Sequence, residues 1–253
     1  PLPNRWILGA VAGVAVDGRD HVWITHRPST LQPNETRSIW KAAPPVLEFD
    51  AAGKFVQGWG GPGAGYQWPE NEHGIFVDDN DVVWIGGQAG TGAGVVKYKK
   101  VANQRVPVDD DMLLKFTTSG KFLQQIGQQN ASTGNQDTKN VKEPADLVIY
   151  RKTNEAFIAD GYGNRRVLVL DADTGAFKRM WGAFGNVPVD AKPAPLRPGS
   201  VVSGSRSRRR TLSWRPSPPP SSEQRSCSRR SSRTTSASST SPTTRAASCR
   251  SAT

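Results

Sequence analysis

The chain has 253 residues, enough for one or two domains, and a formal net charge of +11, which favours an anionic partner. All of that charge lies in residues 196–253, with twelve Arg, one Glu and neither Lys nor Asp, whereas the rest holds 21 basic and 21 acidic residues. The neutral body argues against nucleic acid binding. It holds no cysteine and so gives no disulfide evidence about the cellular compartment. It has no apolar run long enough to span a membrane, and the absence of a Gly-x-Ser-x-Gly motif argues against serine-type hydrolysis.

One strand–turn–strand pattern occurs three times along the body. The stretches GVAVDGRDHVWITH (13–26) and GIFVDDNDVVWIGG (74–87) align position by position, and DLVIYRKTNEAFIADG (146–161) is a third copy with a longer turn. Two apolar runs separated by Asp, Asn and Gly are typical of a β-hairpin. Asp17, Asp78 and Asp79 fall in these turns and are expected to bind their own backbone, with calcium as an alternative ligand.

A second hairpin is predicted after each of these copies, over residues 46–60, 113–127 and 167–182. Each has a glycine in its turn and ends in Trp-Gly or Ile-Gly. Two hairpins make a four-stranded unit, and three such units fill residues 6–185. Repeated four-stranded units are typical of β-propeller blades, and a Trp or Ile at equivalent ends suits packing of one blade on the next. We therefore predict an all-β propeller with about three blades and no substantial helix.

The last part of the chain has a different composition, rich in Ser, Arg, Pro and Thr. It cannot bury enough apolar surface to offset its conformational entropy, so we predict a propeller over residues 1–190 and a disordered tail over residues 191–253. Three interpretations of the tail are open: a frame-shift artefact, a solvated linker, or an Arg/Ser-rich RNA-binding arm. The first is favoured because the tail begins where the next repeat should start.

The corner Asp160-Gly161-Tyr162-Gly163-Asn164-Arg165-Arg166 resembles the signature of the NHL repeat, in which an Asp-x-x-Asn-x-Arg pattern stands between two strands, with one more residue here between Asp and Asn. NHL propellers commonly close with six blades, and the resemblance therefore implies that half of the ring is absent. Unpaired strand edges and uncovered blade faces follow from this. We expect this chain by itself to fold poorly or to associate.

Three residues extend the resemblance to a specific enzyme family. Arg27 follows the first strand pair, His73 opens the second copy, and Tyr162 lies in the corner of the third. This ordered set resembles the peptidyl-α-hydroxyglycine α-amidating lyases, which are six-bladed propellers. The resemblance implies catalytic roles for Arg27 and Tyr162 and makes His73 one of three zinc ligands. It also implies a small-molecule or peptide substrate in the channel and a secreted or periplasmic location, although the sequence shows no signal peptide.

These residue types suit cleavage of a carbinolamide, in which a hydroxyl proton leaves and negative charge develops. Each residue also has a structural interpretation: a strand-end charge for Arg27, a turn or backbone-bonded residue for His73, and ring packing on Arg165 or a neighbouring blade for Tyr162. His21 and the acidic run 109–111 are expected to be solvated. A non-catalytic propeller that binds a ligand or a protein partner is the main alternative, and a lactonase-like propeller with carboxylate and Asn ligands is a weaker one.

Overall fold

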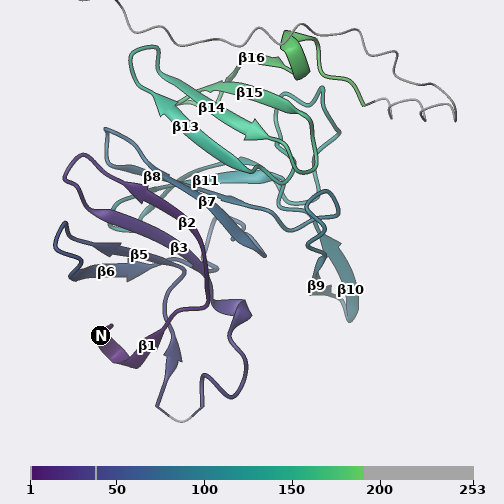
Figure 1. Cartoon of the computed structure of the whole chain (residues 1–253). Coiled ribbons are helices and arrows are strands. Elements are labelled where there is room, and N and C mark those ends of the chain that lie inside the picture. The colour runs from purple at the N-terminus through teal and green to yellow at the C-terminus, as the bar shows by residue number, and fades with distance from the viewer. Residues whose placement is uncertain (1, 38, 191–253) are drawn as a thin grey trace, which may run out of the picture. The chain divides into compact units, whose positions relative to one another are not determined.

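The computed structural model describes residues 2–37 and 39–190, so the predicted disordered tail lies outside the described residues. Within them the chain is all-β and forms three antiparallel four-stranded sheets, each in its sequential strand order (Figure 1). The first sheet comprises β2 (Ala10–Val16), β3 (Val22–Arg27), β5 (Val46–Phe49) and β6 (Phe55–Trp59). The second comprises β7 (Glu72–Val77), β8 (Val82–Gly87), β11 (Met112–Thr117) and β12 (Phe122–Gly127). The third comprises β13 (Asp146–Tyr150), β14 (Glu155–Asp160), β15 (Arg166–Asp171) and β16 (Phe177–Trp181). All six predicted hairpins are confirmed.

The turns of the first hairpins in sheets one and two are held by the same set of hydrogen bonds to an aspartate side chain. The carboxylate of Asp17 accepts the backbone N–H groups of Arg19 and His21 at 2.9 and 3.0 Å, and its other oxygen lies 3.1 Å from the indole nitrogen of Trp23. Asp78 repeats these contacts with the corresponding turn and with the indole of Trp84, also at 3.1 Å. The predicted turn role of both aspartates is confirmed, because each satisfies turn N–H groups that the strand ladder leaves unpaired.

The first strands of the three sheets lie side by side, with β7 in contact with both β2 and β13. Gly13 permits this approach, because a Cβ atom there would lie 2.5 Å from the carbonyl oxygen of His73. Radially placed four-stranded sheets whose first strands adjoin are the arrangement of propeller blades. The structure thus confirms the predicted fold class, an all-β partial propeller of three blades.

The apolar core consists of two layers that lie between successive sheets. Trp23, Ile85, Leu114 and Phe116 belong to one layer, and Trp84, Leu113, Ile158 and Leu168 belong to the other. Strands β8 and β11 contribute to both layers because neighbouring residues of a strand point to opposite faces. Trp59 joins the first two sheets as its position predicts: its ring packs 5.2 Å from Phe116, and its indole N–H bonds the carbonyl of Thr118 at 2.9 Å.

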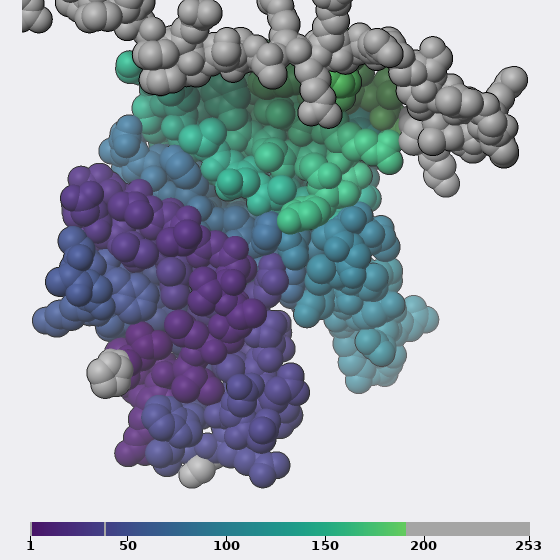
Figure 2. Space-filling model, in the orientation of Figure 1, coloured from purple at the N-terminus to yellow at the C-terminus, as the bar shows by residue number. Residues whose placement is uncertain are grey.

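Two small sheets were not predicted. β1 (Trp6–Ile7) pairs in parallel with β4 (Lys41–Ala42), and β9 (Lys97–Val101) pairs with β10 (Gln104–Val108) in a hairpin. The second hairpin extends from the insertion after β8 and stands apart from the other atoms in the view of Figure 2. Its two-residue turn has positive φ at Ala102 and Asn103, the geometry that suits a tight hairpin. Its strands, of which β9 holds three lysines, lack the regular apolar alternation that marks the other hairpins.

The outer blades expose apolar side chains that the middle blade buries. On β2, Val14 and Val16 are 66% and 58% exposed, and on β13, Val148 is 50% exposed. On β7, Ile75 and Val77 are both buried. The middle blade is covered on both faces by its neighbours, whereas the outer blades each leave one face open. This agrees with a ring that these residues do not close.

Candidate functional site

Arg27, His73 and Tyr162 all lie at the same end of the blades. Arg27 is the last residue of β3, Tyr162 follows β14 by two residues, and His73 is the second residue of β7. In an antiparallel hairpin the start of the first strand adjoins the end of the second, so these positions share one end of their sheets. The contact of β7 with β2 and β13 then places them near one another.

The three side chains form one continuous hydrogen-bonded chain. Nη2 of Arg27 lies 3.3 Å from Nδ1 of His73, and Nε2 of His73 lies 3.2 Å from the Tyr162 hydroxyl oxygen. The Tyr162 ring packs edge-on against the imidazole, with 5.5 Å between the ring centroids. A guanidinium group can only donate, so Nδ1 of His73 is the acceptor and the ring proton resides on Nε2. His73 therefore donates to Tyr162.

The charge state of His73 follows from its surroundings. Burial lowers the pKa of His73, the positive charge of Arg27 lowers it further, and Asp146 acts in the opposite direction. The imidazole is therefore neutral at pH 7, which agrees with an unprotonated Nδ1 facing the guanidinium. Arg27 is also held on its other side, since its Nε donates to the backbone carbonyl of Glu72 at 2.7 Å.

The corner that carries Tyr162 is fixed by the residues of the NHL-like motif. Asp160 is fully buried and accepts hydrogen bonds from the backbone N–H of Lys142 at 2.8 Å, from Asn164 at 2.9 Å and from Arg166 at 2.7 Å. Gly163 donates to the carbonyl of Lys142 at 3.2 Å. The Asp, Asn and Arg of the motif thus turn inward and hold the corner, which leaves Tyr162, 41% exposed, to project toward His73.

A small cavity of about 220 Å³ lies beside His73, between the first strands of the blades. Its lining comprises Ala12, Gly13, Val14, His73, Gly74, Ile75, Ala145 and Asp146. Ala12 and Ala145 occupy the positions on the first and third blades that correspond to His73 on the second. A catalytic zinc takes three protein ligands as a rule. Here the described residues present one histidine at the three equivalent positions, and both of its nitrogens are engaged, so they do not fit a zinc ion at His73.

Another group of side chains could hold a metal ion. One ligand atom from each of Asp17, His21 and Glu48 lies within 4.8 Å of the other two. His21 is not solvated as predicted, since its Nδ1 lies 2.6 Å from Oε1 of Glu48. However, Arg19 already supplies a cation there: its Nη2 lies 2.8 Å from Asp17 and 3.8 Å from Glu48. Burial alone would raise the pKa of Asp17, but hydrogen bonds from Arg19, Trp23 and the turn backbone lower it to about 2.

The acidic run 109–111 is also not solvated as predicted, because Asp110 and Asp111 are buried. Asp110 accepts N–H groups from Glu70, Asn71 and Ala89, at 2.9–3.2 Å, and so ties the insertion after β8 to the segment before β7. Asp111 accepts one N–H bond, from Ser132, and its other oxygen has no partner among the described residues. Burial raises the pKa of Asp111 to about 7.

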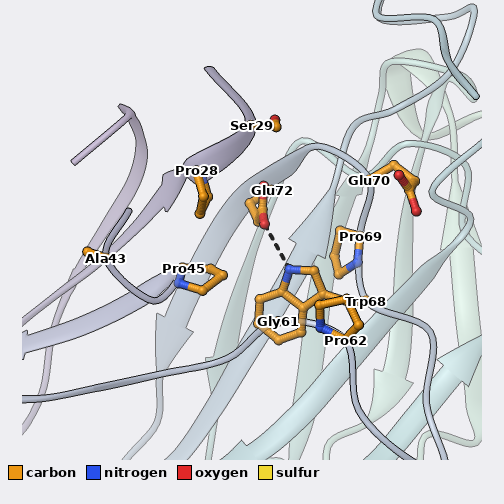
Figure 3. Close-up of a pocket in the computed structure, with 10 residues that line it drawn as sticks. All are labelled: Pro28, Ser29, Ala43, Pro45, Gly61, Pro62, Trp68, Pro69, Glu70 and Glu72. Carbon is orange, nitrogen blue, oxygen red and sulfur yellow. Dashed lines mark hydrogen bonds between the residues drawn. The ribbon is translucent and has the colours of Figure 1, made fainter. Parts of the chain in front are cut away.

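A second pocket beside Arg27 was not predicted from the sequence. Figure 3 shows Trp68 and Glu72 facing each other between proline rings, with the indole N–H 2.8 Å from Oε1 of Glu72. Burial raises the pKa of Glu72, and the Trp68 bond and the charge of Arg27 only partly oppose this. The sequence signal was the run Trp68-Pro69-Glu70-Asn71-Glu72 immediately before His73. An aromatic residue and a carboxylate at the start of a strand do not form a known site motif, so the sequence pattern did not identify them.

Solved structures that are similar to part of this chain include the following two. Apo AztD from Citrobacter koseri has 10% sequence identity and a TM-score of 0.34 over 72% of this chain and 49% of its own. A protein from Lactobacillus plantarum has 13% identity and a TM-score of 0.31 over 74% of this chain and 60% of its own. No protein-family model matches the sequence, and no curated protein matches it.

Proposed function

We propose that Arg27, His73 and Tyr162 form part of an amidating-lyase-type site that binds the C-terminal α-hydroxyglycine of a peptide. The hydrogen bonds that run from the Arg27 guanidinium through the His73 imidazole to the Tyr162 phenol support this most directly. They join residues of three blades, and 89 positions separate His73 from Tyr162 in the sequence. This chain belongs, in this proposal, to the NHL-type propellers. With three blades, this chain by itself binds such a ligand but does not catalyse its cleavage.

The chemistry of the complete site follows from the positions of these groups. The Tyr162 oxygen, as the phenolate, takes the proton of the substrate hydroxyl, the C–O bond becomes the C=O of glyoxylate, and the C–N bond breaks. The electron pair of the broken C–N bond stays on the amide nitrogen, which receives the proton that Tyr162 took up. His73 holds the phenol oxygen through its Nε2–H, and Arg27 holds His73 and offers a permanent positive charge to the substrate carboxylate.

The family resemblance also implies a metal and a location. It implies a zinc ion with His73 as one ligand, but the described residues do not fit zinc at His73, so the proposal assigns zinc no step. A calcium role for the turn aspartates has less support, since Asp17 and Asp78 bind backbone N–H groups. No helix in residues 2–37 and 39–190 has the length and apolarity to cross a membrane. A secreted or periplasmic location accords with the resemblance alone.

The test compares binding of N-benzoyl-α-hydroxyglycine and N-benzoylglycine to the full chain by calorimetry. The hydroxylated ligand is expected to bind more tightly, by about twofold to tenfold, because its hydroxyl gains one hydrogen bond to Tyr162. Tyr162→Phe should remove this difference and leave the melting temperature unchanged. Equal binding of the two ligands to the unmodified chain would refute the proposal. Glyoxylate release should stay at the uncatalysed rate.

A non-catalytic propeller that binds a protein partner is the second candidate. The observation that favours it is the exposure of Val16 and Val148 on the two outer blades, because such apolar faces are normally covered. In that case Tyr162→Phe would have no effect on any ligand, whereas charged substitutions on these faces would abolish association.

A further inference from the structure

The pocket beside Arg27 is connected to the proposed site through two consecutive pairs of residues. Pro28, which lines the pocket, follows Arg27, and Glu72, which also lines it, precedes His73. Glu72 faces both regions, since its backbone carbonyl accepts the Arg27 Nε–H and its carboxylate accepts the indole N–H of Trp68. Each of these two pocket residues is thus the direct neighbour in sequence of a residue of the proposed site.

The walls of this pocket are apolar and rigid. Pro28, Pro45, Pro62 and Pro69 line it together with Trp68 (Figure 3). Proline has a fixed φ and no backbone N–H, so these walls lose little conformational freedom on binding and present few polar groups that need desolvation. Trp68 is 6% exposed and is held by its bond to Glu72 and by ring packing on Phe116. The pocket is therefore formed before any ligand arrives.

The size and charge of the pocket restrict its ligand. Its volume of about 360 Å³ lies at the small end of the range for ligand pockets, which suits one large side chain better than a whole peptide. The acidic residues Glu70, which is paired with Lys99 at 3.2 Å, and Glu72 line it, and no basic residue does, so an acidic side chain there would lack a partner. A flat apolar ring would pack on the proline rings and on the small part of Trp68 that is exposed.

We infer that this pocket binds the penultimate side chain of a peptide ligand, with a preference for an apolar ring and against an acidic group. The inference rests on the proposed function, which places the C-terminal residue of the ligand at Arg27 and His73. Consecutive Cα atoms of a peptide lie about 3.8 Å apart. A ligand with its last residue at Arg27 therefore presents its preceding side chain to the region of Pro28 and Glu72.

The test measures binding of N-acetyl-Phe-Gly, N-acetyl-Ala-Gly and N-acetyl-Glu-Gly to the full chain by calorimetry. None of these probes has the hydroxyl group that the lyase proposal requires. The phenylalanine peptide should bind at least about tenfold more tightly than the alanine peptide, since its ring leaves water, and the glutamate peptide should bind most weakly. Equal affinities, or no binding by any probe, would overturn the inference.

Two matched substitutions locate the effect. Ser29 is an exposed residue of the pocket lining, so Ser29→Trp fills the pocket from its mouth without disturbing the core. It should abolish the preference for phenylalanine and leave binding of the alanine peptide unchanged. Ala52→Trp, in the exposed turn between β5 and β6, is the control and should change neither affinity. A retained preference in the Ser29→Trp variant would contradict the assignment. A side-chain preference without any effect of the hydroxyl in the benzoyl ligands would support the pocket and refute the lyase proposal.

Discussion

The hydroxyl oxygen of Tyr162 lies 3.2 Å from Nε2 of His73, although the two residues belong to different blades and are 89 positions apart. Two separate sets of packing and hydrogen-bond contacts place these residues. The buried Asp160–Arg166 pair holds the corner of Tyr162, and the approach of β2 to β7 at Gly13 brings Arg27 to the other side of the imidazole. The ring of Tyr162 therefore packs on a neighbouring blade, which was one of its two structural interpretations.

The first prediction concerns the protonation of His73. Arg27→Gln removes the positive charge that lowers the pKa of His73, so this pKa should rise toward the ordinary value near 6.5. The imidazole would then be protonated over a higher pH range than in the unmodified chain. Titration of the histidine Cε1–H signal by NMR measures this. Arg105→Gln, on the separate β9–β10 hairpin, is the control and should leave the signal unchanged; a similar shift in both variants would contradict the proposed contact.

The second prediction concerns the buried carboxyl of Asp111. Its pKa of about 7 in the fold exceeds the unfolded value near 3.8, so the folded state binds more protons than the unfolded state between these limits. Its contribution to stability is therefore most favourable below about pH 4 and is lost as the pH rises through 7. Asp111→Asn removes the buried charge and should stabilise the chain by about 1–3 kcal/mol at pH 8, with little difference near pH 4.

Denaturant unfolding over this pH range measures the Asp111 effect. Asp79→Asn, at an exposed turn position, is the matched control and should show no pH-dependent difference from the unmodified chain. If the curves of Asp111→Asn and the unmodified chain ran parallel from pH 4 to 8, the carboxyl would not be the titrating group.

The third prediction concerns association through the outer blades. Val16 on β2 and Val148 on β13 expose about half or more of their surface, so two copies of the chain can bury them against each other. The double substitution Val16→Lys and Val148→Lys should shift the chain from associated to monomeric species in sedimentation velocity. Val101→Lys, at a similarly exposed position on the β9–β10 hairpin, should leave association unchanged. A sharp cooperative melt of a monomeric unmodified chain would contradict the expected association.

The fourth prediction concerns the metal-ligand group at the first turn. Arg19 places its guanidinium against Asp17 and Glu48, so a divalent cation must displace it. Arg19→Ala should leave these carboxylates and His21 free to bind zinc, and added zinc should then raise the melting temperature by mass action. The same gain must persist in an Arg19→Ala, His73→Gln background and disappear when His21→Gln is added. A zinc effect of equal size in the unmodified chain would show that the arginine does not block the group.

Much of the fold was determined by local sequence. The alternation of apolar and polar residues and the turn aspartates specified all six hairpins, because strand periodicity and turn chemistry act over a few residues. The ordered set Arg27, His73 and Tyr162 came from the family resemblance, which matches residues of the sequence at the ends of repeated strands.

Tertiary structure alone decided which strand ends meet and which polar groups lose water. The acidic run 109–111 looks solvated in the sequence, yet the segment before β7 covers it and its N–H groups bind Asp110. His21 reaches Glu48, 27 positions away, only because β3 pairs with β5. Burial and pairing across long sequence separations depend on the packing of whole blades, and no local pattern of residues encodes them.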